Sequence, residues 1–89
     1  VARKVPHIGW GRVSHTGHPI FSDIPSGEFF YFVHSYAAEI GYATIAQCEY
    51  GELFSASIAS KNRVGVQFHP EKSASAGARL LNNFLRWNP

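Results

Sequence analysis

The apolar residues of this sequence follow two patterns, one typical of β-strands and one typical of an α-helix. Residues 29–36 form an aromatic and β-branched run, which predicts a strand buried on both faces. Residues 43–48 predict a second, weaker strand. Residues 54–59 and 64–69 alternate apolar and polar side chains, so each is expected to have one solvated face. Pro70 has no amide proton to donate and is expected to end the last strand.

The C-terminal segment has the periodicity of an amphipathic helix running from about Ser75 to Trp87. The apolar face of this predicted helix consists of Ala78, Leu81, Phe84 and Leu85, with Leu80 beside them. Ser73 or Ser75 is expected to supply the oxygen that caps its first turn.

The first third of the chain is rich in residues that form turns. Residues 5–13 contain Pro6, Gly9 and Gly11, which predicts a loop with a short extended piece. Residues 14–28 are expected to be mostly loop, with one helical turn after Pro19. The expected fold class is therefore α/β, mostly strands followed by one C-terminal helix.

Composition narrows the class of protein. The 89 residues suffice for one small domain, and a 45% hydrophobic content predicts a globular chain. The net charge of +2 comes from scattered basic residues, so a nucleic-acid partner is not expected. No apolar run approaches the roughly 20 residues of a membrane span. A single cysteine, Cys48, indicates a reducing compartment, and we expect a cytoplasmic protein.

His69 and Glu71 are the best candidates for catalytic residues. Period-two geometry places His69 at the C-terminal end of the last predicted strand, beside the start of the helix. Glu71 follows two residues later, beyond Pro70, which fixes the chain direction. A carboxylate beside an imidazole holds one ring nitrogen protonated and leaves the other free to accept a proton. The alternative is that Glu71 only places negative charge in the first turn of the helix.

The remaining histidines and Cys48 are weaker candidates. His34 lies in the aromatic strand and is expected to be a core histidine with its hydrogen bonds satisfied. His15 and His18 resemble half a metal site, but no acid or cysteine cluster completes it, so we expect no metal. His7 is interpreted as a loop histidine. Cys48 is followed by Tyr50 rather than by a small residue and is interpreted as a small hydrophobic residue, not a nucleophile.

Three runs of the sequence together resemble one family. They are residues 6–10 (PHIGW), 31–36 (YFVHSY) and 65–73 (GVQFHPEKS). The His-Pro-Glu run resembles class I glutamine amidotransferases in general, which have a flavodoxin-like fold. The other two runs resemble, more narrowly, the C-terminal half of the glutaminase subunit of imidazole glycerol phosphate synthase. By this resemblance, residues 1–89 are part of an amidotransferase domain whose N-terminal half is missing.

The resemblance implies a reaction and assigns residues to it. A cysteine attacks the glutamine side-chain amide, and the ammonia released passes to a cyclase subunit with a (β/α)₈ barrel, in histidine biosynthesis. His69 resembles the general base and Glu71 the carboxylate that orients it. Ser35 and Tyr36 resemble residues that hold the glutamine substrate, and Trp10 resembles a cyclase-facing residue, as does Lys72. No cofactor is implied.

The sequence departs from the family pattern in two places. It contains no Gly-x-Cys-x-Gly run, so the nucleophile is expected to lie outside these residues and the isolated chain to be inactive. Gly11 stands where the family usually has asparagine. Two alternatives therefore remain open, a non-catalytic binding module that only docks to a partner, or the amidotransferase part of anthranilate or GMP synthesis.

Overall fold

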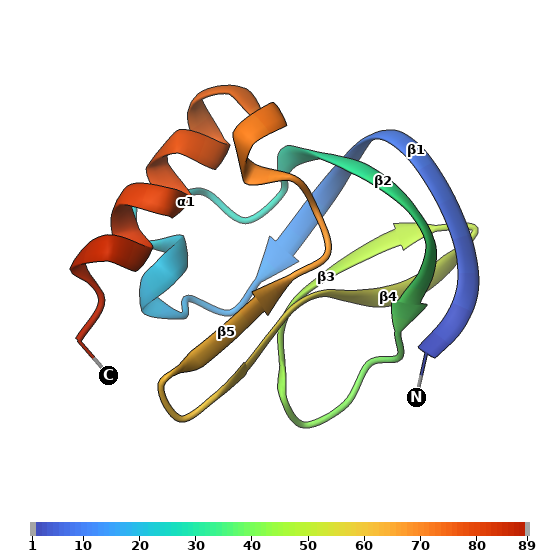
Figure 1. The fold of residues 1–89 in the computed structure, drawn as a ribbon, viewed down its shortest axis with the longest axis horizontal. Coiled ribbons are helices and arrows are strands. Elements are labelled where there is room, and N and C mark those ends of the chain that lie inside the picture. Colours follow the sequence, from blue (N-terminus) through green and yellow to red (C-terminus); the bar gives the residue numbers. More distant parts are fainter. Residues whose placement is uncertain (1, 89) are drawn as a thin grey trace.

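The computed structural model describes residues 2–88, which form a five-stranded antiparallel sheet and a C-terminal helix (Figure 1). The strands lie in the order β2-β1-β3-β4-β5. They are β1 (Ala2–His15), β2 (Glu28–Ala38), β3 (Thr44–Tyr50), β4 (Glu52–Ser60) and β5 (Arg63–Val66). The helical elements are the 3₁₀ turns η1 (Pro19–Phe21) and η2 (Pro70–Lys72) and the helix α1 (Ala74–Arg86). The predicted arrangement, mostly strands followed by one C-terminal helix, is confirmed.

The expectation of a loop at residues 5–13 is wrong, because these residues lie inside the long strand β1. β1 pairs with β2 along most of its length, from Ala2 opposite Ala38 to Val13 opposite Glu28. The register shifts between Lys4 and His7, so Pro6 lies within an irregularity of the ladder, where a residue without an amide proton is tolerated. Long-range pairing therefore overrides the local turn signal of this segment.

β2 is buried on one face rather than on both. Phe30 and Phe32 are fully buried, whereas Phe29 and Val33 on either side of them are 44% and 43% exposed. The alternation is the one expected of an antiparallel strand with one face on the core. The strand therefore presents apolar side chains to the outside as well as to the core.

The buried and solvated positions of β4 also differ from the prediction. Ser55 and Ser57 are buried, and Ile58 is 43% exposed. The Ser55 hydroxyl donates to the carbonyl of Glu39 at 2.8 Å, and the Ser57 hydroxyl donates to the carbonyl of Gly65 at 2.9 Å. Burial of both hydroxyls is tolerated because each has a hydrogen-bond partner.

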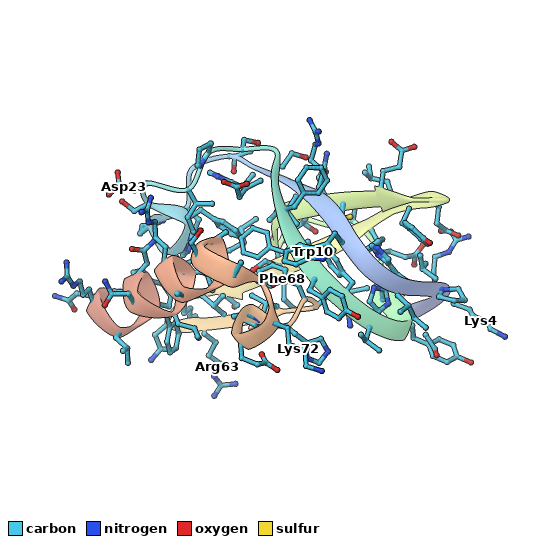
Figure 2. The ribbon with its side chains drawn as sticks, turned by 90° about the horizontal axis from the view of Figure 1, so that it is seen from above. Lys4, Trp10, Asp23, Arg63, Phe68 and Lys72 are labelled. Atoms are coloured by element: carbon cyan, nitrogen blue, oxygen red, sulfur yellow. The ribbon has the colours of Figure 1, made fainter. Side chains whose placement is uncertain are left out.

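The chain after β5 crosses from one edge of the sheet to the other. β5 ends at Val66, earlier than predicted, and the Gln67 amide then donates to the Ala56 carbonyl at 2.8 Å. Two residues later the His69 amide donates to the Tyr31 carbonyl of β2, also at 2.8 Å. Phe68, between them, is buried with its ring 4.3 Å from that of Phe30 (Figure 2). The segment after β5 thereby bridges β4 and β2 over an aromatic core.

Helix α1 forms where predicted but packs with a different face. Its buried residues are Gly77 and Leu80, whereas Leu81 and Leu85 of the predicted apolar face are 45% and 81% exposed. Asn83 explains the difference, because its amide donates to the carbonyls of Ile20 and Ser22 at 3.0 and 2.7 Å. Those bonds turn a partly polar face toward η1 and leave the apolar stripe outside.

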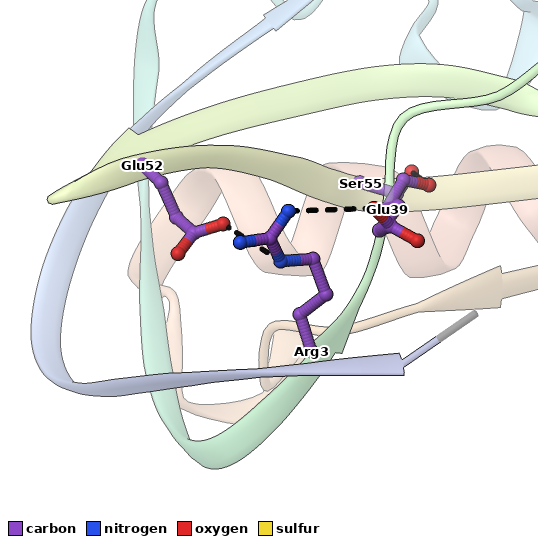
Figure 3. Close-up of polar contacts among 4 residues, drawn as sticks. All are labelled: Arg3, Glu39, Glu52 and Ser55. Carbon is purple, nitrogen blue, oxygen red and sulfur yellow. Dashed lines mark hydrogen bonds and ion pairs between the residues drawn. The ribbon is translucent and has the colours of Figure 1, made fainter.

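An ion-pair cluster links β1, β4 and Glu39, the residue that follows β2 (Figure 3). The Arg3 guanidinium lies 3.5 Å from a Glu39 carboxylate oxygen and 3.2 Å from one of Glu52. All three side chains are more than two-fifths exposed, so each pair contributes at most about 1 kcal/mol to the free energy of unfolding.

Within residues 2–88, no helix combines the length and apolar character that a membrane crossing requires.

The close approach of α1 to η2 generates a prediction about Gly77. Alanine normally stabilises a helix interior over glycine by about 1 kcal/mol. At this position, however, an added Cβ would collide with the Pro70 carbonyl and crowd the Ser73 Cβ. We expect Gly77→Ala to lower the free energy of unfolding by about 1–3 kcal/mol, measured by circular dichroism at one fixed protein concentration.

The matched control is Asn82→Ala, which introduces the same residue at an exposed position of α1. It should leave stability unchanged or raise it slightly, because alanine has the higher helix propensity. Gly77→Ala as stable as the parent chain would contradict the packing of α1 on η2.

Candidate active site

His69 and Glu71 lie together at the turn between β5 and α1. His69 has an extended backbone, with φ −102° and ψ 98°, and immediately precedes Pro70, which begins η2. Glu71 lies in the single turn of η2, so its side chain folds back toward His69. The His69 Nδ1 atom is 3.1 Å from the Glu71 Oε2 atom. The pairing expected from the sequence is therefore present in the geometry.

The surroundings of this pair favour a charged carboxylate beside a base. The pKa of Glu71 is lowered, first by a hydrogen bond from its own backbone and then by the hydrogen bond with His69. A carboxylate at Nδ1 keeps the proton on that nitrogen, which leaves Nε2 as the proton acceptor. Side-chain exposures of 37% for His69 and 62% for Glu71 leave the imidazole open to a reactant. The arrangement can therefore accept and return a proton.

Ser73 connects the His69 turn to strand β2, and the sequence patterns missed this. Its hydroxyl accepts a hydrogen bond from the Tyr31 amide at 2.9 Å and donates to the His69 carbonyl at 2.6 Å. The expectation that Ser73 or Ser75 caps the helix is wrong, because Ser73 occupies the N-cap position without a side-chain cap bond. No local signal could reveal the link, since Tyr31 and Ser73 are 42 positions apart.

Trp10 lies on the outer face of the β1–β2 pair, next to the His69 turn. It is directly opposite Tyr31 in the ladder, and the two rings are 5.7 Å apart in an edge-to-face arrangement. Trp10 is 50% exposed, and we call its exposed apolar neighbourhood the ribbon patch. The ribbon patch consists of Ile8, Trp10, Phe29 and Val33. Lys72, also exposed, ends η2 next to Glu71 (Figure 2).

Ser35 and Tyr36 lie further along β2 than Tyr31, which contacts the His69 turn. Four to five extended residues span about 13–17 Å. Both side chains are exposed, Tyr36 by 60%. Among the hydrogen bonds and ion pairs of residues 2–88, none joins Ser35 or Tyr36 to His69 or Glu71. These two residues are thus on the same strand as the site without direct contact to the candidate base.

Two other imidazoles, those of His7 and His34, differ from the sequence-based expectations in different ways. His7, interpreted as a loop residue, is 1% exposed and stacks between Phe32 and Tyr50, at ring distances of 4.7 and 3.8 Å. His34 lies edge-on to His7 at 5.6 Å. Both ring nitrogens of His7 and of His34 are shielded from solvent and lack a hydrogen-bond partner. The expectation that His34 has its hydrogen bonds satisfied is therefore wrong.

Cys48, His15 and His18 each have a structural environment that explains the residue without a catalytic role. Cys48 is 1% exposed, and burial raises the pKa of its thiol to about 11, with a smaller contribution from Glu49. His15 bonds the Ile24 carbonyl at 2.7 Å and accepts from the Gly17 amide. His18 accepts from the Ile20 amide and so caps η1. Across the described positions, no group of three or more metal-ligating side chains is assembled.

The sequence that forms this site matches one known protein family. Residues 1–87 match the sequence profile described as glutamine amidotransferase class-I. The match covers more than half of the chain, and the chain belongs to the class I glutamine amidotransferase family.

Within that family, the chain is similar to a particular subunit. It is 56% identical over 84 residues to the imidazole glycerol phosphate synthase subunit HisH of Shewanella loihica. It is 57% identical over 82 residues to the HisH subunit of Vibrio cholerae. These matches cover 94% and 91% of this chain but only 38% and 40% of the relatives. The chain therefore spans about two-fifths of the length of the curated relatives that it matches.

The buried imidazoles generate a prediction about pH. Burial is the main cause that lowers the pKa of both His7 and His34. Repulsion from His7, when His7 is protonated, lowers the pKa of His34 further. The backbone of Trp10 raises the pKa of His7, and that of Tyr36 raises the pKa of His34, by smaller amounts. The unfolded chain therefore binds more protons than the folded chain below a pH of about 6.5. We expect the unfolding midpoint to be constant above this pH and to fall as the pH drops from about 6.5 through the lowered pKa values.

The variant His7→Phe isolates the contribution of His7, because a phenyl ring can stack in the same place without titrating. Its unfolding midpoint should fall less between pH 8 and pH 5 than that of the parent chain, whatever its stability at pH 8. An equal fall in both proteins would contradict the burial of a neutral His7.

Proposed function

We propose that this chain supplies the histidine and the carboxylate of a Cys-His-Glu glutaminase triad. The observation that carries the proposal is the 3.1 Å contact between His69 Nδ1 and Glu71 Oε2, within a class I glutamine amidotransferase sequence. In this assignment His69 is the general base and acid, and Glu71 holds its proton on Nδ1.

The proposed reaction moves one proton through His69 Nε2. His69 accepts the proton of a cysteine thiol, and the thiolate attacks the amide carbon of glutamine. His69 then donates that proton to the leaving nitrogen, so ammonia departs and a thioester remains. In the second half, His69 accepts a proton from water, the hydroxide attacks the thioester, and His69 gives the proton to the departing cysteine sulfur as glutamate is released.

The nucleophile is assigned to a part of the protein outside these residues. Cys48 is an unsuitable nucleophile, because it is buried and its thiol pKa is about 11, so little thiolate forms near neutral pH. Residues 1–89 would then be the C-terminal half of a domain, and the remaining half would cover the exposed apolar stripe of α1 around Leu81 and Leu85. In the proposed complete site, Ser35 and Tyr36 hold the glutamine substrate at the end of β2.

Ammonia is proposed to pass to a cyclase subunit with a (β/α)₈ barrel, which makes imidazole glycerol phosphate. Trp10 and Lys72 are assigned to the surface that faces this partner. The ribbon patch supports the assignment, since clustered exposed aromatic and aliphatic side chains are typical of protein interfaces. Tyr31 connects the patch to the His69 turn, because Tyr31 pairs with Trp10 and its carbonyl accepts a hydrogen bond from the His69 amide.

A second candidate function is a binding module that docks through the ribbon patch without catalysis. The exposed patch favours docking for both the glutaminase and the binding module. Only a measurement of glutamine hydrolysis therefore distinguishes the two functions. The other alternative, a role in anthranilate or GMP synthesis, is disfavoured by the 56–57% identity to HisH subunits.

The test uses the full-length Shewanella loihica HisH subunit in which this segment replaces the matched residues, assayed with its cyclase partner. We expect the chimera to release glutamate from glutamine, and His69→Ala to lower kcat by about 10²–10⁴-fold through loss of the base. Glu71→Gln should cause a smaller loss, because the imidazole remains but its proton is no longer held on Nδ1.

The control is Cys48→Ala, which should retain full activity. A fully active His69→Ala chimera would contradict the proposed triad. A folded, partner-binding chimera without turnover would favour the binding module instead, and loss of turnover in Cys48→Ala alone would return the nucleophile to this chain.

A further inference from the structure

We propose that Ser73 is a positioning residue for His69, acting through the His69 backbone. This inference rests on the proposed function, because it assigns a role to Ser73 within the same site. The geometry on which it depends is a ring of hydrogen bonds between the His69 turn and β2. None of these bonds involves the imidazole itself.

His69 and Tyr31 are joined through both of their backbone groups. The His69 amide donates directly to the Tyr31 carbonyl at 2.8 Å. In the other direction, the Tyr31 amide donates to the Ser73 hydroxyl at 2.9 Å, and that hydroxyl donates to the His69 carbonyl at 2.6 Å. Two opposite residues that exchange both backbone hydrogen bonds form a hydrogen-bonded pair of an antiparallel ladder. Here the Ser73 oxygen is inserted into the second bond.

A hydroxyl suits this place because it must accept one hydrogen bond and donate another at the same time. Serine provides both roles from one atom, whereas alanine provides neither. Ser73 is 1% exposed, so water cannot readily replace the missing hydroxyl. The His69 carbonyl also accepts from the Lys72 amide at 3.0 Å, which fixes the turn of η2 on the same atom.

The packing of α1 keeps the Ser73 hydroxyl in position. Gly77, one turn along the helix, leaves no side chain between α1 and η2, and its amide donates to the Ser73 carbonyl at 3.1 Å. A side chain at Gly77 would press on both the Pro70 carbonyl and the Ser73 Cβ. The packing of α1 on η2 therefore fixes the position of Ser73. The Ser73 hydroxyl in turn fixes the His69 backbone, which orients the imidazole toward Glu71.

Ser73 would ordinarily be interpreted as a helix cap at the start of α1. The structure argues against that role, because the Ser73 side chain makes no bond to the first turn. Both partners of the hydroxyl instead belong to the site, one on β2 and one on the candidate base. A capping residue would affect stability alone, whereas a positioning residue also affects the rate of the chemical step.

The experiment compares Ser73→Ala, Ser73→Thr and Ser75→Ala in the full-length Shewanella loihica chimera described above. We expect Ser73→Ala to lower kcat by up to about 10²-fold, the cost of displacing a catalytic group by about 1 Å, with an unchanged KM for glutamine. Ser73→Thr keeps the hydroxyl and should recover most of kcat. Ser75→Ala removes an exposed hydroxyl from the same helix start and should match the parent.

Deuterium exchange at the Tyr31 amide provides an independent readout that does not depend on Ser73→Thr folding. Ser73→Ala should accelerate exchange at this amide while the amides of β3 and β4 keep their protection. Accelerated exchange throughout the sheet, together with a raised KM, would mean general destabilisation and would overturn the proposal.

The outcomes separate this inference from the proposed function. If His69→Ala is inactive but Ser73→Ala retains full kcat, the triad assignment stands and the positioning role of Ser73 is wrong. If His69→Ala is itself fully active, the proposed function fails regardless of Ser73. Loss of kcat in Ser73→Thr equal to that in Ser73→Ala, with normal folding, would also overturn the role of the hydroxyl.

Discussion

The hydrogen bonds between Tyr31 and His69 are the constraint on which the site depends. They join the segment after β5 to the opposite edge of the sheet, and the ring of Phe68 in this segment packs against Phe30 of β2. Without this link, β5 and the packing of α1 near η1 would still anchor the His-Pro-Glu turn, but no hydrogen bond would join its backbone to β2. With it, the candidate base is fixed to the strand that also carries Tyr31, the neighbour of Trp10.

Part of this structure could be predicted because its determinants are local. His69 and Glu71 are two positions apart, and Pro70 between them sets the chain direction, so their contact follows from the sequence alone. The strands β3 and β5 and the helix α1 also follow from local periodicity and turn residues. Ser73 could not be assigned in this way, because its hydroxyl bridges to Tyr31, a partner that no local pattern indicates.

The errors have a common physical origin in long-range pairing and packing. Gly9 and Gly11 indicate a turn, yet pairing with β2 makes β1 a continuous strand. Helical periodicity identifies the apolar stripe of α1 but not its partner, and the bonds of Asn83 to η1 and the residue after it decide which face packs. The sequence neighbours of His7 are turn formers and indicate a loop, whereas its stacking partners come from β2 and β3 and bury it.

The proposed role of Glu71 is to keep the proton of the neutral His69 imidazole on Nδ1, so that Nε2 acts as the base. The most direct test is ¹⁵N NMR of the His69 imidazole at a pH where the ring is neutral, in the labelled chain and in Glu71→Gln. We expect a protonated Nδ1 and an unprotonated Nε2 in the parent chain, with the preference weakened or reversed in the variant. A proton on Nε2 in the parent chain, unchanged by Glu71→Gln, would show that Glu71 does not set the tautomer of His69.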